Sequence, residues 1–169
     1  MAMDKIMEGW RQYLTEEDAK YAGILMLIPD DDMINNIRLI SADLPSVAVP
    51  LKEEDLHVTL LGHKALGPHR KALRAIRDGE GIPPGPPIIL ATNEEGMPIV
   101  EKRPPVGAKP DGSTKESWVV WLEDENQQDM RDYVNQVMEM VGGPSDPEPN
   151  RRFHISIANL TGDPHDSVK

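Results

Sequence analysis

Two short motifs in this chain place a histidine two residues before a hydroxyl side chain. The first is His57-Val58-Thr59 and the second is His154-Ile155-Ser156. Apolar residues surround both motifs, which predicts that each forms part of a strand. Residues i and i+2 of a strand share one face, so each strand is expected to carry an imidazole and a hydroxyl on one side and apolar side chains on the other.

Two imidazoles and two hydroxyls arranged in this way suit the cleavage of a phosphodiester. One histidine takes a proton from the attacking water or hydroxyl and the other protonates the leaving oxygen, because imidazole titrates near neutral pH. Thr59 and Ser156 can donate hydrogen bonds to the non-bridging phosphate oxygens as charge develops. The motifs therefore predict His57, Thr59, His154 and Ser156 as catalytic residues that need no metal or other cofactor. The alternative is a pair of ordinary hydrogen-bonded strand histidines.

The elements that would position these motifs alternate along the chain. Strands are expected at 20–28, 56–61, 117–122 and 153–160, helices at 30–44, 68–78 and 125–141, and a hairpin at 88–102. Proline and glycine predict irregular structure at 82–87 and a loop at 103–114. This order predicts an α+β fold with largely antiparallel sheets. Residues 1–16 are expected to form an amphipathic leader helix ahead of a single domain at 17–169.

Composition limits the function classes. The chain has 169 residues, of which 38% are hydrophobic, and this suits one compact domain. It has no cysteine, which excludes disulfides, thiolate metal sites and a cysteine nucleophile. No apolar run is long enough to cross a bilayer and no segment resembles a signal peptide, so a cytoplasmic location is expected.

The charge of the chain indicates the size of its ligand. The formal net charge is −11. Proteins that bind long nucleic acids usually carry a basic face, because phosphate contacts supply most of the affinity. We therefore expect a small nucleotide held in a pocket, no long nucleic acid and no membrane partner. Solubility alone is the other explanation of the acidity.

Three residues are the expected substrate contacts beyond the motifs. Tyr21 and Trp118 are aromatic side chains on expected strands and can stack on a base. Trp118 and Trp121 are expected on opposite faces of their strand, so at most one of them faces the site. Arg152 directly precedes the second motif and can meet a phosphate. Further cations that could do so are Lys102, Arg103 and Arg151.

Other patterns have simpler explanations. Lys109-Pro110-Asp111-Gly112 fits the lysine motif of ATP-dependent nucleic-acid ligases, but Pro-Asp-Gly is a turn signal by itself. His57, His63 and His69 recur at a spacing too wide for metal ligands on one strand or helix. Asp30-Asp31-Asp32 is better explained by helix capping than by Mg²⁺. No metal site is predicted.

At its two motifs the sequence resembles the 2H phosphoesterase superfamily. The resemblance covers about residues 20–160 by element order, and its specific match is the two motifs. It implies a bilobal, pseudo-symmetric fold, with antiparallel sheets that line a central cleft and helices outside, and catalytic roles for both motif pairs. Members open 2′,3′-cyclic phosphates on RNA ends, cleave 2′–5′-linked oligoadenylates, open cyclic phosphates of ADP-ribose, or degrade cyclic oligonucleotide signals in phage anti-CBASS defence. Only thirteen residues follow Ser156, so a C-terminal lid would be short or missing.

The expected function is metal-independent hydrolysis of a small nucleotide phosphodiester, such as a cyclic oligonucleotide, a 2′–5′ linkage or a 2′,3′-cyclic phosphate. An immune signal degraded on behalf of a phage is one such substrate, and the protein would then act in the host cytoplasm. Three alternatives stay open. One is a 2′,3′-cyclic phosphodiesterase that acts on RNA ends in RNA repair, and another is a nucleotide-binding sponge without turnover. The third is a structural or assembly protein, for which the leader helix is the only hint. The motifs do not tell which histidine is the base.

Overall fold

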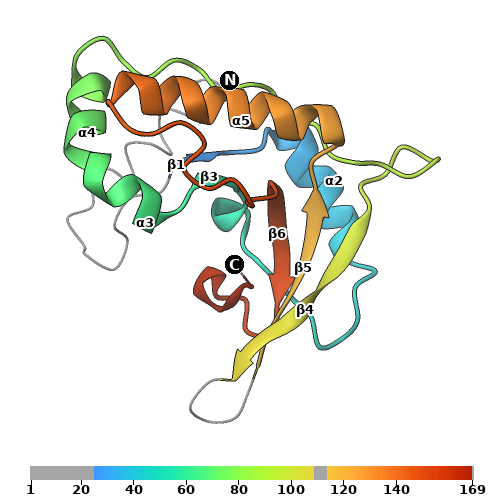
Figure 1. The fold of residues 1–169 in the computed structure, drawn as a ribbon. Coiled ribbons are helices and arrows are strands. Elements are labelled where there is room, and N and C mark those ends of the chain that lie inside the picture. Colours follow the sequence, from blue (N-terminus) through green and yellow to red (C-terminus); the bar gives the residue numbers. More distant parts are fainter. Residues whose placement is uncertain (1–24, 109–113, 169) are drawn as a thin grey trace. The chain divides into compact units, whose positions relative to one another are not determined.

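A computed structural model describes residues 25–108 and 114–168 (Figure 1). The expected leader helix at 1–16 and Tyr21 lie outside the described residues. The protein is mixed α/β with an antiparallel sheet of six strands, which confirms the expected α+β class. The chain forms two compact units. One comprises Met1–Ile28, Thr59–Ile88 and Asp124–Phe153, and the other comprises Pro29–Val58, Ile89–Glu123 and His154–Lys169.

The strands follow the hydrogen-bonding order β1-β3-β6-β5-β4, with β2 also paired to β6. Their bounds are β1 Leu25–Leu27, β2 Val49–Pro50, β3 Val58–Leu61, β4 Val100–Ala108, β5 Thr114–Trp121 and β6 His154–Asn159. Figure 1 shows β4, β5 and β6 side by side in yellow, orange and red. The last strand, β6, pairs antiparallel with β2, β3 and β5, so it is central to the second unit.

Helix α2 (Asp31–Ser41) belongs to this second unit and begins as the acidic run predicts. The Asp30 side chain caps the helix by accepting a hydrogen bond from the Met33 N–H at 2.8 Å. Asp31 and Asp32 occupy the first turn, where carboxylates interact favourably with the helix dipole. Ile34 and Ile37 are the buried residues of the helix. The predicted helix at 30–44 is confirmed, and its regular part ends three residues early.

The predicted loop at 103–114 is wrong, because most of it is strand. Strand β4 continues to Ala108 and pairs with β5 from Thr114 onward. The sequence misleads here because Pro104 and Pro105 have no N–H to donate to a ladder. They fall at a register shift between Arg103 and Val106, in the outermost strand of the order. A bulge in an edge strand is the place where a sheet tolerates proline.

The predicted hairpin at 88–102 is present, but as isolated bridges rather than two strands. Thr92 bridges to Pro98, and the Ile99 N–H donates to the Ala91 carbonyl at 3.1 Å. The turn between them is stabilised by Asn93, whose side-chain oxygen accepts the N–H groups of Glu95 and Met97. Regular strand structure begins only at Val100.

Within the described residues, the first unit contains α3 (His63–Leu66), α4 (Arg70–Asp78) and α5 (Asp124–Met140). Helix α5 lies within the predicted range 125–141 apart from its first residue, and it buries an apolar stripe: Met130, Tyr133, Val134, Val137 and Met138. The proline-rich segment 82–87 has no regular structure, also as predicted. It is fixed to α5 by two hydrogen bonds, from the Tyr133 hydroxyl to the Pro83 carbonyl at 2.7 Å and from the Asn126 amide to the Pro87 carbonyl at 2.8 Å. In the part of the chain that the structure describes, no helix has the length and apolar character of a membrane span.

Candidate active site

Both motif strands have the two-sided character that the sequence predicts. Beside the first motif, Leu56, Val58 and Leu60 are buried, whereas His57 and Thr59 are partly exposed. The second motif repeats this pattern. Its buried residues are Phe153, Ile155 and Ile157, and its partly exposed residues are His154 and Ser156. Each strand therefore packs on its apolar side and leaves an imidazole and a hydroxyl on the other.

The register of β3 and β6 places the two histidines on one face. Val58 aligns with Ile155 in an antiparallel pair. The residue before Val58 therefore lies opposite the residue after Ile155, so His57 falls opposite Ser156. His154 shares the face of Ser156 and is the diagonal neighbour of His57. Diagonal neighbours in such a pair are about 7–8 Å apart, within reach of long side chains. Thr59 follows two residues after His57 on β3 and belongs to the other compact unit.

The ring of His57 is held in one tautomer. Its Nδ1 lies 2.8 Å from the backbone oxygen of Asp55. A carbonyl oxygen only accepts, so Nδ1 carries the proton of this hydrogen bond. In the neutral ring, Nε2 is then the nitrogen without a proton, as a general base requires. Asp55 thus orients His57 through its backbone.

The environment of His57 favours the neutral ring. Burial lowers its pKa below the ordinary 6.5, and the opposing effects of the Asp55 carbonyl and the Asp55 carboxylate are smaller. His57 is accordingly neutral at neutral pH and can accept a proton. The Asp55 carboxyl is itself shifted, since burial and the neighbouring Glu54 raise its pKa.

We expect this pKa shift to be visible in solution. The His57 ring should titrate with a midpoint below pH 6.5 in the folded protein, because burial disfavours the imidazolium. Histidine ring signals followed by NMR against pH would measure it, with His57→Ala to assign the signal. Since the unfolded chain binds this proton more readily, the stability that His57 contributes is complete above pH 6.5 and is lost as the pH falls through the folded pKa. A midpoint at or above 6.5 would contradict the shift.

His154 has an aromatic neighbour on β5. Trp121 aligns with His154 in the β5–β6 register, and their ring centroids are 5.0 Å apart in an edge arrangement with 64° between the planes. The indole N–H of Trp121 donates to the Glu101 carboxylate, and the Arg103 guanidinium lies 5.4 Å from the centre of the indole ring. Glu101, Arg103 and Trp121 therefore form one polar and aromatic cluster beside His154.

The structure places the other predicted aromatic elsewhere. Trp118 is only 4% exposed, and its ring faces Lys102 rather than a motif histidine. Trp118 and Trp121 lie on opposite faces of β5, as predicted, but the one beside His154 is Trp121. The sequence shows that only one tryptophan can face the site. Choosing between them requires the pairing of β5 with β6, which no local pattern encodes.

The two arginines before the second motif have different environments. Arg152 is exposed, two residues before His154. Arg151 instead pairs with Glu148, with nitrogen–oxygen distances of 3.0 Å and 2.8 Å, and Glu148 also accepts the Gly62 N–H at 3.0 Å. Burial alone would raise the pKa of Glu148, but these hydrogen bonds outweigh it and lower the pKa. Arg151 is thus committed to a structural contact in the first unit.

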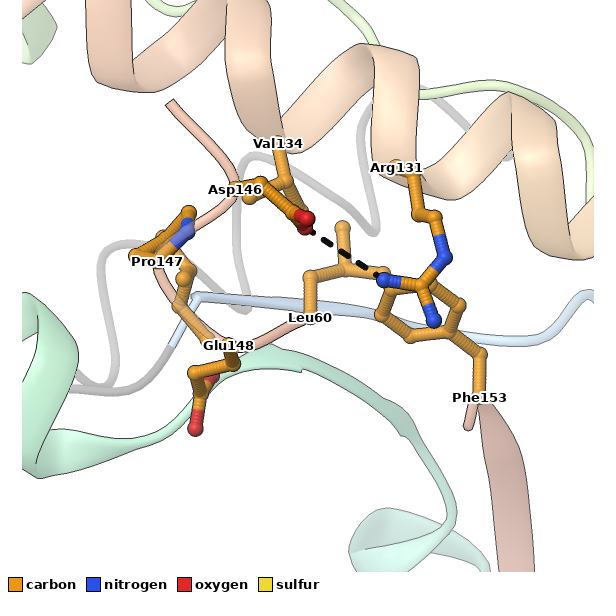
Figure 2. Close-up of a pocket in the computed structure, with 8 residues that line it drawn as sticks. Leu60, Arg131, Val134, Asp146, Pro147, Glu148 and Phe153 are labelled. Carbon is orange, nitrogen blue, oxygen red and sulfur yellow. Dashed lines mark hydrogen bonds and ion pairs between the residues drawn. The ribbon is translucent and has the colours of Figure 1, made fainter. Parts of the chain in front are cut away.

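A small cavity lies beside Pro147 and Glu148, within the first unit (Figure 2). Its volume is about 10 Å³, and a cavity needs at least about 10–15 Å³ to hold a single water. Figure 2 shows the Arg131 guanidinium paired with Asp146, above the ring of Phe153. The cavity is therefore too small for a nucleotide. A larger open groove of about 470 Å³ runs along α5, but Asp132 and Glu139 line it and would repel phosphate.

Metal ligands do not gather anywhere in the described residues, since no group of three or more His, Cys, Asp or Glu side chains there could hold an ion. His63 is exposed at the start of α3. His165 is also exposed, and its Nδ1 lies 2.9 Å from Asp163. These two histidines are accounted for without a metal.

Comparison of the chain with protein-family models, with curated proteins and with solved structures finds no match. The resemblance to the 2H phosphoesterases therefore depends on the two motifs and their strands. Any functional argument has to come from the chemistry of His57, His154 and the side chains around them.

Proposed function

We propose that this protein is a metal-independent phosphodiesterase of the 2H type, which hydrolyses a small nucleotide phosphodiester by two-histidine acid-base catalysis. The observation that carries the proposal is the register of β3 and β6. It gives His57 and His154 one shared face of two paired strands, with Ser156 opposite His57.

The state of His57 supports a division of roles that the motifs alone leave open. We assign His57 as the general base, because its Nδ1–H is bound to the Asp55 carbonyl and its pKa is lowered by burial. His57 Nε2 takes the proton of the attacking water or hydroxyl as the new phosphorus–oxygen bond forms. His154 is the general acid and protonates the leaving oxygen as the old bond breaks.

The hydroxyls have a separate task in this mechanism. Ser156 and Thr59 donate hydrogen bonds to the non-bridging phosphate oxygens, where negative charge grows in the transition state. After each turnover His57 is protonated and His154 is neutral, and exchange with water restores both. The products are a phosphate monoester and an alcohol.

The bilobal 2H fold is part of the same proposal. The division of the chain into two compact units supports it. Both histidines fall in the second unit, whereas the resemblance implies one motif in each half, so the halves of the proposed fold would not coincide with these two units.

The proposed substrate class follows from the charge of the chain. A net charge of −11 disfavours long nucleic acid, so we propose a cyclic oligonucleotide, a 2′–5′ linkage or a 2′,3′-cyclic phosphate as the substrate. An immune-signal nucleotide cleared on behalf of a phage, in the host cytoplasm, is the biological setting that fits this chemistry. A 2′,3′-cyclic end on RNA is the second candidate within the class.

The proposal predicts turnover that is insensitive to chelation. A panel of 2′,3′-cyclic mononucleotides, 2′–5′ diadenylate, and cyclic di- and trinucleotides should be incubated with the protein in EDTA and analysed by chromatography. At least one member should be hydrolysed at the same rate with and without EDTA, because protons are moved by imidazoles alone. Loss of activity that added metal restores would instead indicate a metalloenzyme.

The same panel separates an enzyme from a sponge. A sponge would bind one member tightly and return it unchanged after denaturation, whereas an enzyme returns product. Hydrolysis that disappears in His154→Ala rules out a contaminating phosphatase. Tight binding without turnover of any member would replace the proposed activity with sequestration.

A further inference from the structure

Trp121 connects a cation on β4 to the histidine on β6. The Arg103 guanidinium lies 5.4 Å from the centre of the indole, and the His154 ring lies 5.0 Å from it. Trp121 also donates its N–H to Glu101, which fixes the orientation of the indole. A guanidinium and an imidazole are thus held against one rigid ring, on the face that carries the second motif.

The charge of Arg103 is not neutralised within the described residues. Its guanidinium lies over the indole of Trp121, and no ion pair joins it to a carboxylate of residues 25–108 or 114–168. The adjacent Lys102 differs in both respects, since it points to the opposite face, lies over the buried Trp118 and pairs with Glu116 at 2.6 Å. Two neighbouring cations of one strand therefore have separate environments, and only Arg103 faces the motif side.

We propose that Arg103 binds a second phosphate of the substrate, next to the phosphodiester that the histidines cleave. This inference rests on the proposed function and narrows its substrate class. The preferred substrate carries at least two phosphates, as a cyclic dinucleotide, a cyclic trinucleotide or a 5′-phosphorylated cyclic nucleotide does. A cyclic mononucleotide with a single phosphate would leave Arg103 without a ligand.

Chemistry favours a phosphate over other groups at this place. Arginine presents a planar set of donors that matches two phosphate oxygens, and stacking on an aromatic ring leaves the edge of that set available. Stacking also lowers the entropy that the side chain loses on binding, because the guanidinium is already positioned. Glu101 is the one opposing charge in the cluster, and its hydrogen bond to Trp121 occupies part of its acceptor capacity.

The geometry also assigns a role to Trp121. Arg103 lies over the indole ring, His154 contacts the indole and Glu101 binds its N–H, so the ring face beneath Arg103 is closed to a nucleobase. Trp121 acts as the spacer that sets how far the second phosphate lies from the scissile one.

Binding of two product-like nucleotides would test this inference without turnover. Adenosine 3′,5′-bisphosphate and adenosine 3′-monophosphate differ by the one phosphate assigned to Arg103. Titration calorimetry at constant ionic strength should be run on the wild type, Arg103→Gln and, as a matched control, Lys102→Gln. Circular dichroism would confirm that all three are folded.

We expect the wild type to prefer the bisphosphate, and Arg103→Gln to weaken its binding by at least about tenfold, as is typical for a lost hydrogen bond to a charged group. Arg103→Gln should change the dissociation constant of the monophosphate by less than about twofold relative to the wild type. Lys102→Gln should change the dissociation constant of either nucleotide by less than about twofold. A wild type that binds both nucleotides equally, or neither, would overturn the inference. So would an Arg103→Gln variant that weakens both ligands alike, or neither.

The outcome can be separated from that of the proposed function. If a panel member is hydrolysed but Arg103→Gln binds the bisphosphate as tightly as the wild type does, only the second-phosphate site is rejected. Selective loss of bisphosphate binding in Arg103→Gln, together with no hydrolysis of any member, would support the site and reject the catalytic proposal.

Discussion

Replacing either motif histidine with alanine should lower kcat/KM for the substrate by at least about 100-fold, since general acid-base groups contribute roughly 10²–10⁴-fold each. The protein should stay folded, because His57 and His154 lie on the partly exposed side of strands whose opposite side forms the core. Initial rates over a range of substrate concentrations would measure the loss. His165→Ala is the control, since His165 is exposed and paired with Asp163.

A substrate with an activated leaving group would distinguish the two histidines. A p-nitrophenyl ester of the same nucleotide needs no proton on its leaving oxygen, so His154→Ala should recover most of its activity on that ester. His57→Ala should stay impaired, because a base is still required to activate the nucleophile. Recovery in His57→Ala alone would exchange the two roles. Full activity of both variants on the natural substrate would refute the mechanism.

The second large effect is expected in stability. Phe153→Ala should lower the free energy of unfolding by about 3–5 kcal/mol, as is usual for deletion of a buried aromatic ring. Phe153 is 2% exposed, and its backbone N–H and carbonyl are both bound by the Gln127 side chain, at 2.7 Å and 2.8 Å. The ring also borders the small cavity of the first unit, so the space that it leaves would enlarge that cavity.

Urea unfolding followed by circular dichroism would measure this loss. Leu39→Ala is a suitable control, because Leu39 on α2 is 63% exposed and surface substitutions usually change stability by less than about 0.5 kcal/mol. A loss below about 1 kcal/mol for Phe153→Ala would show that residues 146–148 and α5 move to fill the space that the ring leaves.

Local patterns predicted most of what positions the histidines. The alternation of apolar and polar residues around His57 and His154 identified both strands and the side of each that is buried. The acidic run at Asp30 marked the start of α2, and the apolar stripe from Met130 marked α5. These features depend on residues close to one another in the sequence, so local sequence patterns are enough to predict them.

What the sequence did not reveal depends on contacts between distant strands. His57 lies opposite Ser156 because β3 and β6 are neighbours and pair in one particular register. The pairing of β5 with β6 selects Trp121 over Trp118. The part of β4 from Arg103 onward was mistaken for a loop, because a bulge at an edge makes its prolines acceptable and edges are properties of the assembled sheet.

The position of β6 also affects how the protein is made. β6 pairs with β2, β3 and β5, yet it follows all of them in the chain. On the ribosome these three strands leave the exit tunnel before the strand that joins them, so their pairing has to wait for residues 154–159. Pairings over such long sequence separations form slowly. Strands β2, β3 and β5 therefore expose unpaired edges until β6 is synthesised. The second histidine of the proposed catalytic pair, His154, belongs to this same last strand.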